Sequence, residues 1–253
     1  DWTLSRGLGD VYKRQIEYHV DKNGLKCPTC NSDLGNRQAK MSKSLGNTVS
    51  PEIMVDEYGA DTVRLFILYG ANPEAGMDWS DNAIISNHKQ MQSIIDAFES
   101  SRSFIDAPSE IDSWLLSKMR LNHLKWKSAM ENISLREGVM ISHFEMLSDW
   151  QWYRRRGGSD RKSTEVFFRH WIPMLAPATP HIAEEFWSKV GNQDMVSEYI
   201  ISDVSELEDD IIHIAKEQYL RDLIDSSRNV KGLASRHSEV AISKCIIQTS
   251  PKW

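Results

Sequence analysis

The sequence predicts a mainly α-helical protein, with one short strand-forming stretch near each end. Through most of the chain apolar residues recur every three or four positions, which is the period of one face of an α-helix. Ser50 and Thr179 each stand directly before a proline, the pattern of a helix N-cap followed by proline at the first helical position. Only residues 16–20 and 240–247 have the pattern of short strands. We therefore expect compact helical units followed by a small partial α/β tail.

Length and composition exclude several classes of protein. The chain has 253 residues, of which 40% are hydrophobic and 26% charged, enough apolar material for one or two cores. Its formal net charge of −6 argues against a protein that coats nucleic acid, so any RNA contact must come from local basic patches. Three cysteines and no apolar run of about 20 residues argue against a secreted disulfide scaffold and a membrane span. A cytoplasmic protein without a membrane partner is expected.

The first fifteen residues are predicted to be non-native. Residues 1–15 begin without methionine and show no period, and residues 10–15 (Asp-Val-Tyr-Lys-Arg-Gln) read like the translation of an adapter used in DNA library preparation. We therefore leave this segment out of the fold prediction and expect the chain to be truncated at its N-terminus.

A short hairpin is expected next, and it leads to a Cys-x-x-Cys pair. Residues 16–21 alternate between apolar and polar, and Asn-Gly at residues 23–24 supplies the turn. Cys27 and Cys30 have the spacing of a zinc knuckle, in which two thiolates bind one tetrahedral ion. A structural zinc site needs four ligands, and only His19 and Asp33 lie near in sequence. We expect zinc in the full-length protein at a site split with upstream residues; a turn without metal is the alternative.

The most informative stretch is the loop Lys40-Met41-Ser42-Lys43-Ser44. Its two ammonium groups, three positions apart, are interleaved with small hydroxyls and followed by a glycine. Such a loop suits a polyphosphate, because lysine offsets the charge that develops when pyrophosphate leaves and backbone N–H groups share that task. The alternative is an ordinary solvated basic loop.

Two short helices are predicted after this loop. Ser50 caps the first, which continues through Glu57 and ends at Gly59, while Asp61 caps the second, which ends at Gly70. The second helix has its apolar residues at helical spacing, namely Val63, Phe66, Ile67 and Tyr69. A simple helical linker is the alternative for this unit.

Longer helices follow. Ser80 caps a helix over residues 81–102, and Ala-Pro-Ser at residues 107–109 marks a domain boundary. Beyond it, three faces show helical periodicity: Met140, Phe144 and Leu147; Val166, Phe167, His170, Trp171, Met174 and Leu175; and Ile182, Ala183, Phe186 and Val190. Trp171 and Trp187 are predicted to be core residues rather than platforms for base stacking, since their spacing is helical.

The helix that begins after Thr179 carries His181, Glu184 and Glu185 close together. These residues could be mistaken for an acid/base cluster. Capping and the positive end of the helix dipole explain them without chemistry. We therefore assign them a structural role.

These features together resemble a known family. Residues 40–47 resemble the KMSKS signature loop of class I aminoacyl-tRNA synthetases letter for letter, and residues 56–66 are similar to the segment that follows that loop. Within the class, residues 71–81 and 171–187 resemble the leucyl-tRNA synthetases, and the later part is more similar to the archaeal and eukaryotic type than to the bacterial type. The resemblance covers residues 38–253.

The resemblance implies a reaction, substrates and a division of the chain. Enzymes of this family activate leucine with ATP, with Mg²⁺, and transfer the leucyl group to tRNA-Leu; we expect a monomer. Lys43 matches the loop lysine that stabilises departing pyrophosphate, with Lys40 in a weaker role, and Met41, Ser42 and Ser44 complete the ATP-binding loop. The expected segments are the end of the catalytic core with knuckle and loop (16–50), a stem-contact unit (51–106), an anticodon-binding-type bundle (107–200) and a partial α/β segment (201–253).

The family's H-I-G-H motif does not occur among these residues, so the chain alone is expected to be inactive. Two alternatives remain at this stage. A valyl, isoleucyl or methionyl enzyme shares the loop, and a noncatalytic tRNA- or protein-binding module could combine a knuckle with a bundle. The intact loop lysines argue against the second alternative.

One basic patch stands out against the negative total charge. The stretch from Trp152 to Gly158 holds three arginines and two aromatic residues beside a glycine pair, and further cations follow it. Arg154, Arg155, Arg156 and Lys162 are predicted to bind tRNA phosphates, with the aromatics packing or stacking beside them. A solvated loop without a partner is the alternative.

Overall fold

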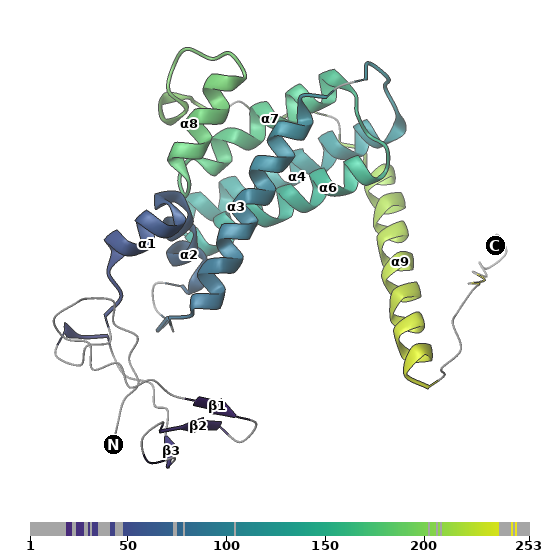
Figure 1. The fold of residues 1–253 in the computed structure, drawn as a ribbon. Helices are drawn as coiled ribbons and strands as arrows, with labels where there is room; N and C mark the ends of the chain where they lie inside the picture. The colour runs from purple at the N-terminus through teal and green to yellow at the C-terminus, as the bar shows by residue number, and fades with distance from the viewer. Residues whose placement is uncertain are drawn as a thin grey trace.

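The computed structural model describes residues 19–21, 24–27, 30, 32–34, 41–43, 48–72, 75–77, 79–103, 105–201, 203–205, 207, 209–237, 244 and 246, and it is mainly α-helical (Figure 1). The α-helices are α1 (Pro51–Tyr58), α2 (Ala60–Gly70), α3 (Asp81–Ser101), α4 (Glu110–Glu131), α5 (Leu135–Val139), α6 (Met146–Arg155), α7 (Arg161–Leu175), α8 (Pro180–Lys189) and α9 (Ile211–His237). A π-helix, η2 (Met140–Glu145), joins α5 to α6, and a 3₁₀ turn, η3 (Val196–Glu198), follows α8. In the described part of the chain, no helix is long and apolar enough to cross a membrane.

A small antiparallel sheet precedes the helices. Its strands are β1 (His19–Asp21), β2 (Gly24–Lys26) and β3 (Asp33–Leu34), in that order across the sheet. His19 pairs with Lys26, which confirms the predicted hairpin over its described residues. The predicted segment 1–15 lies outside the described residues, as does the predicted strand at 240–247 apart from residues 244 and 246.

The first helical unit has its own small core. The buried side chains of Met54, Val63, Phe66 and Ile84 bring α1, α2 and α3 together, and Phe66 meets Trp79 edge to face at 4.9 Å between ring centroids. Gly59 separates α1 from α2 with φ of 84°, a conformation that glycine adopts without steric cost. The predicted ends of α1 and α2 and the Ser80 cap of α3 agree with the structure, whereas Ser50 occupies the N-cap position of α1 without a side-chain hydrogen bond and α2 already begins at Ala60. Ile67 was expected in the core, but its side chain is 55% exposed.

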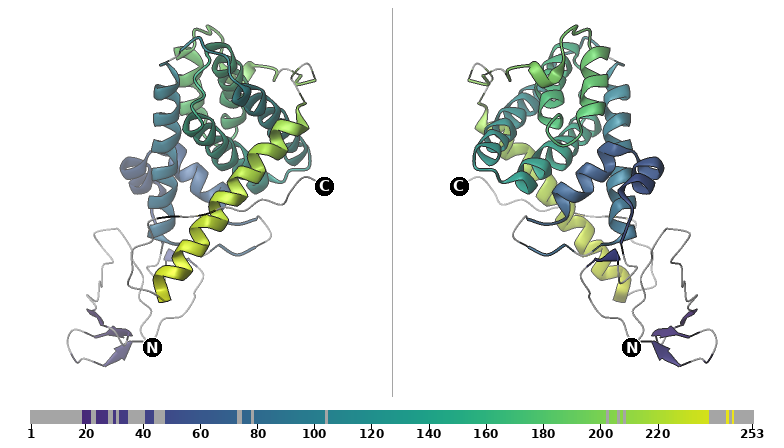
Figure 2. Two further views of the ribbon diagram at one scale, coloured as in Figure 1. Left: turned by 90° about the vertical axis from the view of Figure 1, so that its right-hand side faces the viewer. Right: turned by 90° about the vertical axis from the view of Figure 1, so that its left-hand side faces the viewer.

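The larger core lies within the bundle and draws on α2, α3, α4, α6, α7 and α8, which are seen from two further sides in Figure 2. Its centre is aromatic: the rings of Trp150, Phe167, Phe168 and Trp171 contact one another with centroids 4.9 to 5.6 Å apart. Trp171 and Trp187 are both buried, as predicted. Burial of such large rings contributes strongly to the stability of the bundle.

The π-helix η2 shifts the apolar face that the sequence predicts. A π-helix holds an extra residue per turn, so a pattern counted at 3.6 residues per turn loses its register there. Met140 is consequently 38% exposed, although it was expected on the same buried face as Leu147. Ile141 and Ser142 are buried instead, and the Ser142 carbonyl accepts a hydrogen bond from Trp171 Nε1 at 2.6 Å.

Helix α2 is fastened to the start of α8 by two side chains. The Asp61 carboxylate accepts a hydrogen bond from the Ile182 N–H at 2.8 Å. Its Oδ1 also lies 2.8 Å from His181 Nδ1. Arg64 Nε donates to the Ala178 carbonyl at 2.9 Å. Asp61 therefore caps α8 from a distance of about 120 residues, and the prediction that it caps its own helix is wrong.

The predicted roles at the start of α8 change accordingly. Thr179 occupies the N-cap position, but its hydroxyl bonds the Leu175 carbonyl and His143 instead of capping the helix. Glu184 accepts the N–H groups of Val196 and Ser197, which fastens the η3 turn rather than serving the helix dipole.

Helix α9 lies within the predicted segment 201–253. Its first half packs on α4, whereas its C-terminal half extends away from the bundle (Figures 1 and 2). This arrangement places one face of α9 opposite α6.

Candidate nucleic-acid interface

The contact between α6 and α9 depends on Glu217. This carboxylate is only 8% exposed and accepts three hydrogen bonds, from Trp152 Nε1 at 2.8 Å, Arg156 Nε at 3.0 Å and Arg156 Nη2 at 3.2 Å. Both carboxylate oxygens are therefore engaged by donors from the end of α6. A buried carboxylate with this many donors is strongly held, because removal of either side would leave polar groups unpaired.

Arg221, one turn further along α9, forms a second fastening. Its Nη2 donates to Asp149 Oδ1 at 3.0 Å, and its guanidinium lies 5.0 Å from the ring centroid of Trp114 and 4.9 Å from that of Trp152. Cation–π contacts of this kind hold the planar guanidinium of Arg221 in one orientation. Asp149 is buried and is held in turn by Asn122 Nδ2 at 2.9 Å and by Lys118 at 3.7 Å.

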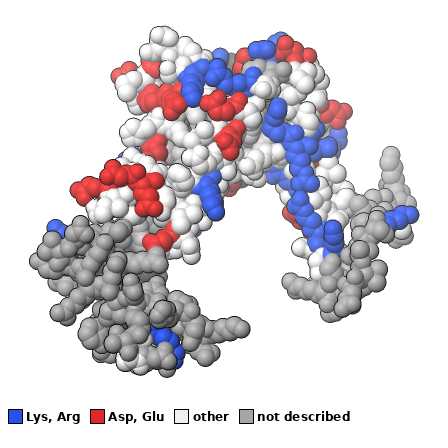
Figure 3. Space-filling model, in the orientation of Figure 1, with Lys and Arg blue, Asp and Glu red and all other residues white. Residues whose placement is uncertain are grey.

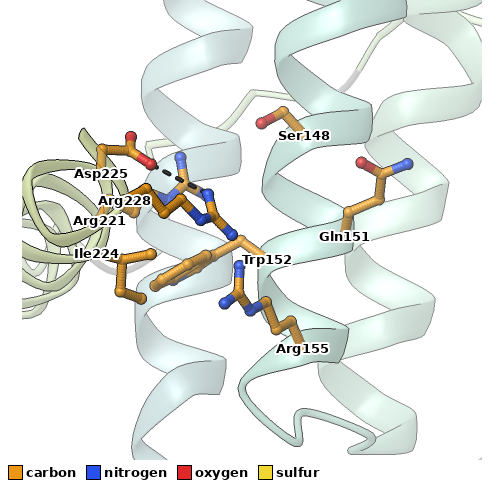
Figure 4. A pocket seen from close by; sticks show the side chains of 8 residues that line it. All are labelled: Ser148, Gln151, Trp152, Arg155, Arg221, Ile224, Asp225 and Arg228. Atoms are coloured by element: carbon orange, nitrogen blue, oxygen red, sulfur yellow. Dashed lines mark hydrogen bonds and ion pairs between the residues drawn. The ribbon is translucent and has the colours of Figure 1, made fainter. Parts of the chain in front are cut away.

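Beside these contacts, an open cleft of about 380 Å³ remains between α6 and α9, which we call the arginine cleft. Figure 4 shows its lining: α6 contributes Ser148, Gln151, Trp152 and Arg155, and α9 contributes Arg221, Ile224, Asp225 and Arg228. In Figure 3, Lys and Arg side chains form a band along this junction and down α9, whereas the surface over α1 is acidic. On the face shown in Figure 3, positive charge is thus concentrated along α6 and α9 despite the negative total charge of the chain.

Two cations at the mouth of the arginine cleft face solvent. Arg155 is exposed and lies over the Trp152 ring at 5.6 Å from its centroid, and it makes no ion pair in the described part of the chain. Arg228 is also exposed and pairs with Asp225 at 3.1 Å, a contact that water weakens. With Gln151 and Ser148 beside them, these groups offer charge and hydrogen-bond donors to a phosphate backbone.

The predicted arginine patch is only partly available to a ligand. Arg154 lies over the Trp150 ring and its Nη1 donates to the Gly158 carbonyl at 3.0 Å, while Arg156 is bound to Glu217. Of the four predicted residues, only Arg155 lines the arginine cleft; Lys162 is exposed on α7, outside it.

The glycine pair forms a tight turn rather than a flexible loop. Gly157 has φ of 89°, and a Cβ at Gly158 would lie 2.1 Å from the Tyr153 ring. The Tyr153 hydroxyl donates to Asp112 and accepts the Asp160 N–H, and burial raises its pKa. This turn therefore fixes the end of α6, where Arg154, Arg155 and Arg156 lie.

Arg221 and Arg228 were not predicted to take part. Seven positions separate them, which places them on the same face of one helix, two turns apart. That spacing is a signal the sequence contains, but only the packing of α9 on the bundle shows which face it concerns.

The lysine loop is described over three residues. Met41 and Lys43 are exposed and Ser42 is half-buried, whereas Lys40 and Ser44 lie outside the described residues. The structure therefore shows Lys43 exposed, and the predicted pairing of Lys43 with Lys40 stays a prediction.

The two cysteines flank a tight turn. The Cys27 N–H donates to the Ser32 carbonyl at 2.9 Å, and Cys30 Sγ lies 3.0 Å from Ser32 Oγ, a contact that lowers the pKa of the Cys30 thiol. Among the described residues no cluster of three or more His, Cys, Asp or Glu side chains could hold a metal ion. Cys27 and Cys30 would supply two of the four ligands that a structural zinc site needs, and the predicted split site stays a prediction.

Comparison with known proteins shows which families this chain matches. The family described as the anticodon-binding domain of tRNA ligase matches residues 112–243, and the family of class I tRNA synthetases (I, L, M and V) matches residues 34–80. Leucine-tRNA ligase of Archaeoglobus fulgidus is 31% identical over 208 residues, covering 81% of this chain and 22% of that protein. Leucine-tRNA ligase of Methanosarcina acetivorans is 32% identical over 222 residues, covering 85% and 22%. The chain thus spans about a fifth of the length of these relatives.

A solved structure with the same fold is the Agrobacterium radiobacter K84 agnB2 LeuRS, crystallised as a ternary complex with tRNA and LeuAMS. It superposes with a TM-score of 0.55 and 24% identity, covering 66% of this chain and 22% of that one. This likeness supports the helical fold. The archaeal relatives agree with the resemblance that the sequence motifs predict.

Proposed function

Because the chain belongs to the family of anticodon-binding domains of tRNA ligases, we propose that it is the C-terminal region of a leucine-tRNA ligase and that its arginine cleft binds the backbone of tRNA-Leu. One observation supports this most: the family match over residues 112–243 includes both walls of the cleft, α6 and α9. The leucine-tRNA ligases among its relatives favour tRNA-Leu as the partner.

The chemistry of the arginine cleft suits a phosphate backbone. Arginine donates in a planar fork that matches phosphate oxygens, and Arg155 and Arg228 bring two such forks to one opening from different helices. Arg221 and Arg156 are bound to carboxylates and hold the walls in place. The cleft is therefore ordered before the ligand arrives, which reduces the entropic cost of binding.

In the whole ligase we assign this chain the pyrophosphate-stabilising loop. Lys43, with Lys40 in a weaker role, offsets charge on pyrophosphate as leucine is activated by ATP with Mg²⁺, and Met41, Ser42 and Ser44 shape the loop. The chain alone is inactive in this proposal, because the H-I-G-H motif is not among its residues. The same proposal places the protein in the cytoplasm as a monomer, with the segment boundaries 16–50, 51–106, 107–200 and 201–253.

Binding of tRNA is the direct test. The affinity of the chain for tRNA-Leu, for a tRNA of another specificity and for duplex DNA of similar length is measured at several salt concentrations. We expect salt-dependent binding that is tightest for tRNA-Leu, and weaker binding by Arg155→Gln, while the exposed control Lys125→Gln on α4 binds as the parent does. Equal affinity for all three nucleic acids, or no binding, would contradict the proposal.

Two further assays address the catalytic and metal assignments. Leucine-dependent exchange of pyrophosphate into ATP is expected to be absent with this chain, and measurable exchange would show that it contains a complete catalytic site. Elemental analysis is expected to give less than one zinc per chain, since Cys27 and Cys30 supply two ligands of four. Tight binding of one zinc per chain would show that local residues complete the site.

A further inference from the structure

A second cavity, with a volume of about 840 Å³, lies between the C-terminal ends of α3 and α8 and the first half of α7. Its floor consists of three buried rings, Phe98, Phe168 and Trp187, and Val190 stands half exposed beside them. We call this cavity the aromatic hollow. Cavities of about 300–1,000 Å³ are typical of small-molecule sites, and none of the residues that line this one lines the arginine cleft.

Four cations surround the aromatic hollow, and they are of two kinds. Arg161 pairs with Asp106 at 3.1 Å, and Lys189 pairs with Glu99 at 2.9 Å and with Glu185 at 2.8 Å. Arg102 and Arg169, in contrast, are exposed and have no hydrogen bond or ion pair from their guanidinium groups within the described residues. The two guanidinium groups are therefore available for an anion.

Carboxylates of the described residues do not pair with Arg102 or Arg169. Glu165 is the one carboxylate among the described residues that line the hollow, against the two unpaired arginines. Figure 3 shows basic and acidic side chains together over α7 and α8, in agreement with the paired cations there. A small anion bound at Arg102 and Arg169 therefore contacts two cations that no carboxylate of the described residues pairs with.

Neutral polar groups complete the lining. Asn192 Nδ2 donates to the Trp187 carbonyl at 3.3 Å, and Asn192 Oδ1 has no partner within the described residues, so it can accept from an amino group. The Ser103 hydroxyl is exposed at the same opening. Next to an apolar floor, this combination suits a flat, heteroaromatic group that has hydrogen-bonding edges.

We propose that the aromatic hollow binds a nucleoside monophosphate unit, either free or as an unpaired nucleotide of an RNA. The phosphate lies against Arg102 and Arg169, and the base lies over the apolar floor near Val190. An anion without a base uses only half of this lining. The inference stands on the residues of the hollow and does not rely on tRNA binding by the arginine cleft.

Calorimetric titration of the chain with AMP, CMP, GMP, UMP and inorganic phosphate tests the proposal. We expect at least one nucleotide to bind, with inorganic phosphate about tenfold weaker, since it cannot use the floor. The double variant Arg102→Gln/Arg169→Gln should bind that nucleotide at least about tenfold more weakly, because two charge-assisted contacts are lost. Lys125→Gln, an exposed change on α4, serves as the control that leaves affinity unchanged.

Single-stranded and duplex RNA oligonucleotides distinguish the two sources. Weaker binding of single strands alone by the double variant supports an unpaired nucleotide of RNA, and an effect on mononucleotides alone supports a free nucleotide. If no nucleotide binds, if the double variant keeps the parent affinity, or if phosphate binds as tightly as every nucleotide, the proposal is wrong. Because Arg155 and Arg228 stay intact in this variant, tRNA binding by the arginine cleft is tested separately.

Discussion

The arginine cleft and the aromatic hollow are built from the same residue types but use them differently. In the arginine cleft, Arg221 is bound to the buried Asp149, and beside the cleft Arg156 is bound to the buried Glu217, whereas Arg155 and Arg228 are exposed at its mouth. In the aromatic hollow, Arg102 and Arg169 have no such partner within the described residues. A cation can therefore be part of the fold or available to a ligand, and the position of the nearest carboxylate decides which.

This difference changes how a basic run in a sequence is interpreted. Three consecutive arginines are the most conspicuous basic run in the sequence, yet Arg154 and Arg156 bind groups within the protein. Arginines isolated in sequence, such as Arg228, contribute more exposed charge.

Acidification should lower the stability of the protein most, because the bundle that carries both cavities contains buried histidines. Burial lowers the pKa of His143 to about 3, and burial together with His123 and Arg169 lowers that of His170 to about 4. Both side chains are neutral in the folded state, so stability is full above pH 6.5 and falls as pH drops below it. Each histidine then lowers the free energy of unfolding by about 1.4 kcal/mol per pH unit, until the pH reaches the pKa of that histidine in the folded state.

Denaturant unfolding between pH 7 and 4 measures this loss. The variant His170→Gln should show a shallower dependence on pH, by about 1.4 kcal/mol per unit below pH 5.5. An identical dependence in parent and variant would show that His170 does not stay neutral in the bundle.

Glu217→Ala should have the next largest effect and should act on the arginine cleft alone. It leaves Trp152 Nε1 and Arg156 without their acceptor, and we expect a loss of about 2–3 kcal/mol in the free energy of unfolding. The exposed control Asp222→Ala, one turn along α9, should cost less than about 0.5 kcal/mol. Equal losses in the two variants would contradict the role given to Glu217.

Asp61→Ala should have a smaller effect and should act on the side of the aromatic hollow. It removes the cap that α2 supplies to α8, whose C-terminal end lines the hollow, and should cost about 1–2 kcal/mol. Thermal unfolding measures the loss, and amide exchange should rise at the start of α8 but not in α9. Faster exchange in α9 would show that the two regions are not separate.

Much of the fold follows from local signals in the sequence. Ser80 marks the start of α3 because it caps a neighbouring N–H group, and the proline that follows Ser50 or Thr179 marks the start of α1 or α8. The aromatic spacing of α7 identifies its buried face. The π-helix η2 was missed because its extra residue follows no simple periodicity.

The candidate site was less predictable, for a physical reason. Asp61 reaches a helix about 120 residues away, and Arg155 and Arg228 line one cleft only because α9 lies beside α6. Such pairings depend on tertiary packing, which a single sequence does not encode locally. The family resemblance identified the lysine loop and the bundle, but it did not indicate which arginines face a ligand.

The central claim is that arginines gathered by the packing of α6 on α9, and not the contiguous run, bind tRNA. Two double variants test it most directly: Arg155→Gln/Arg228→Gln and Arg154→Gln/Arg156→Gln, each measured for thermal stability and for the salt dependence of tRNA-Leu binding. The first pair should lower the slope of log affinity against log salt by about 1.4–1.8, as expected for two lost phosphate contacts, with unchanged stability. The second should lower stability and leave the slope nearly unchanged. The opposite pattern, with the slope lost only in the second pair, would contradict the account.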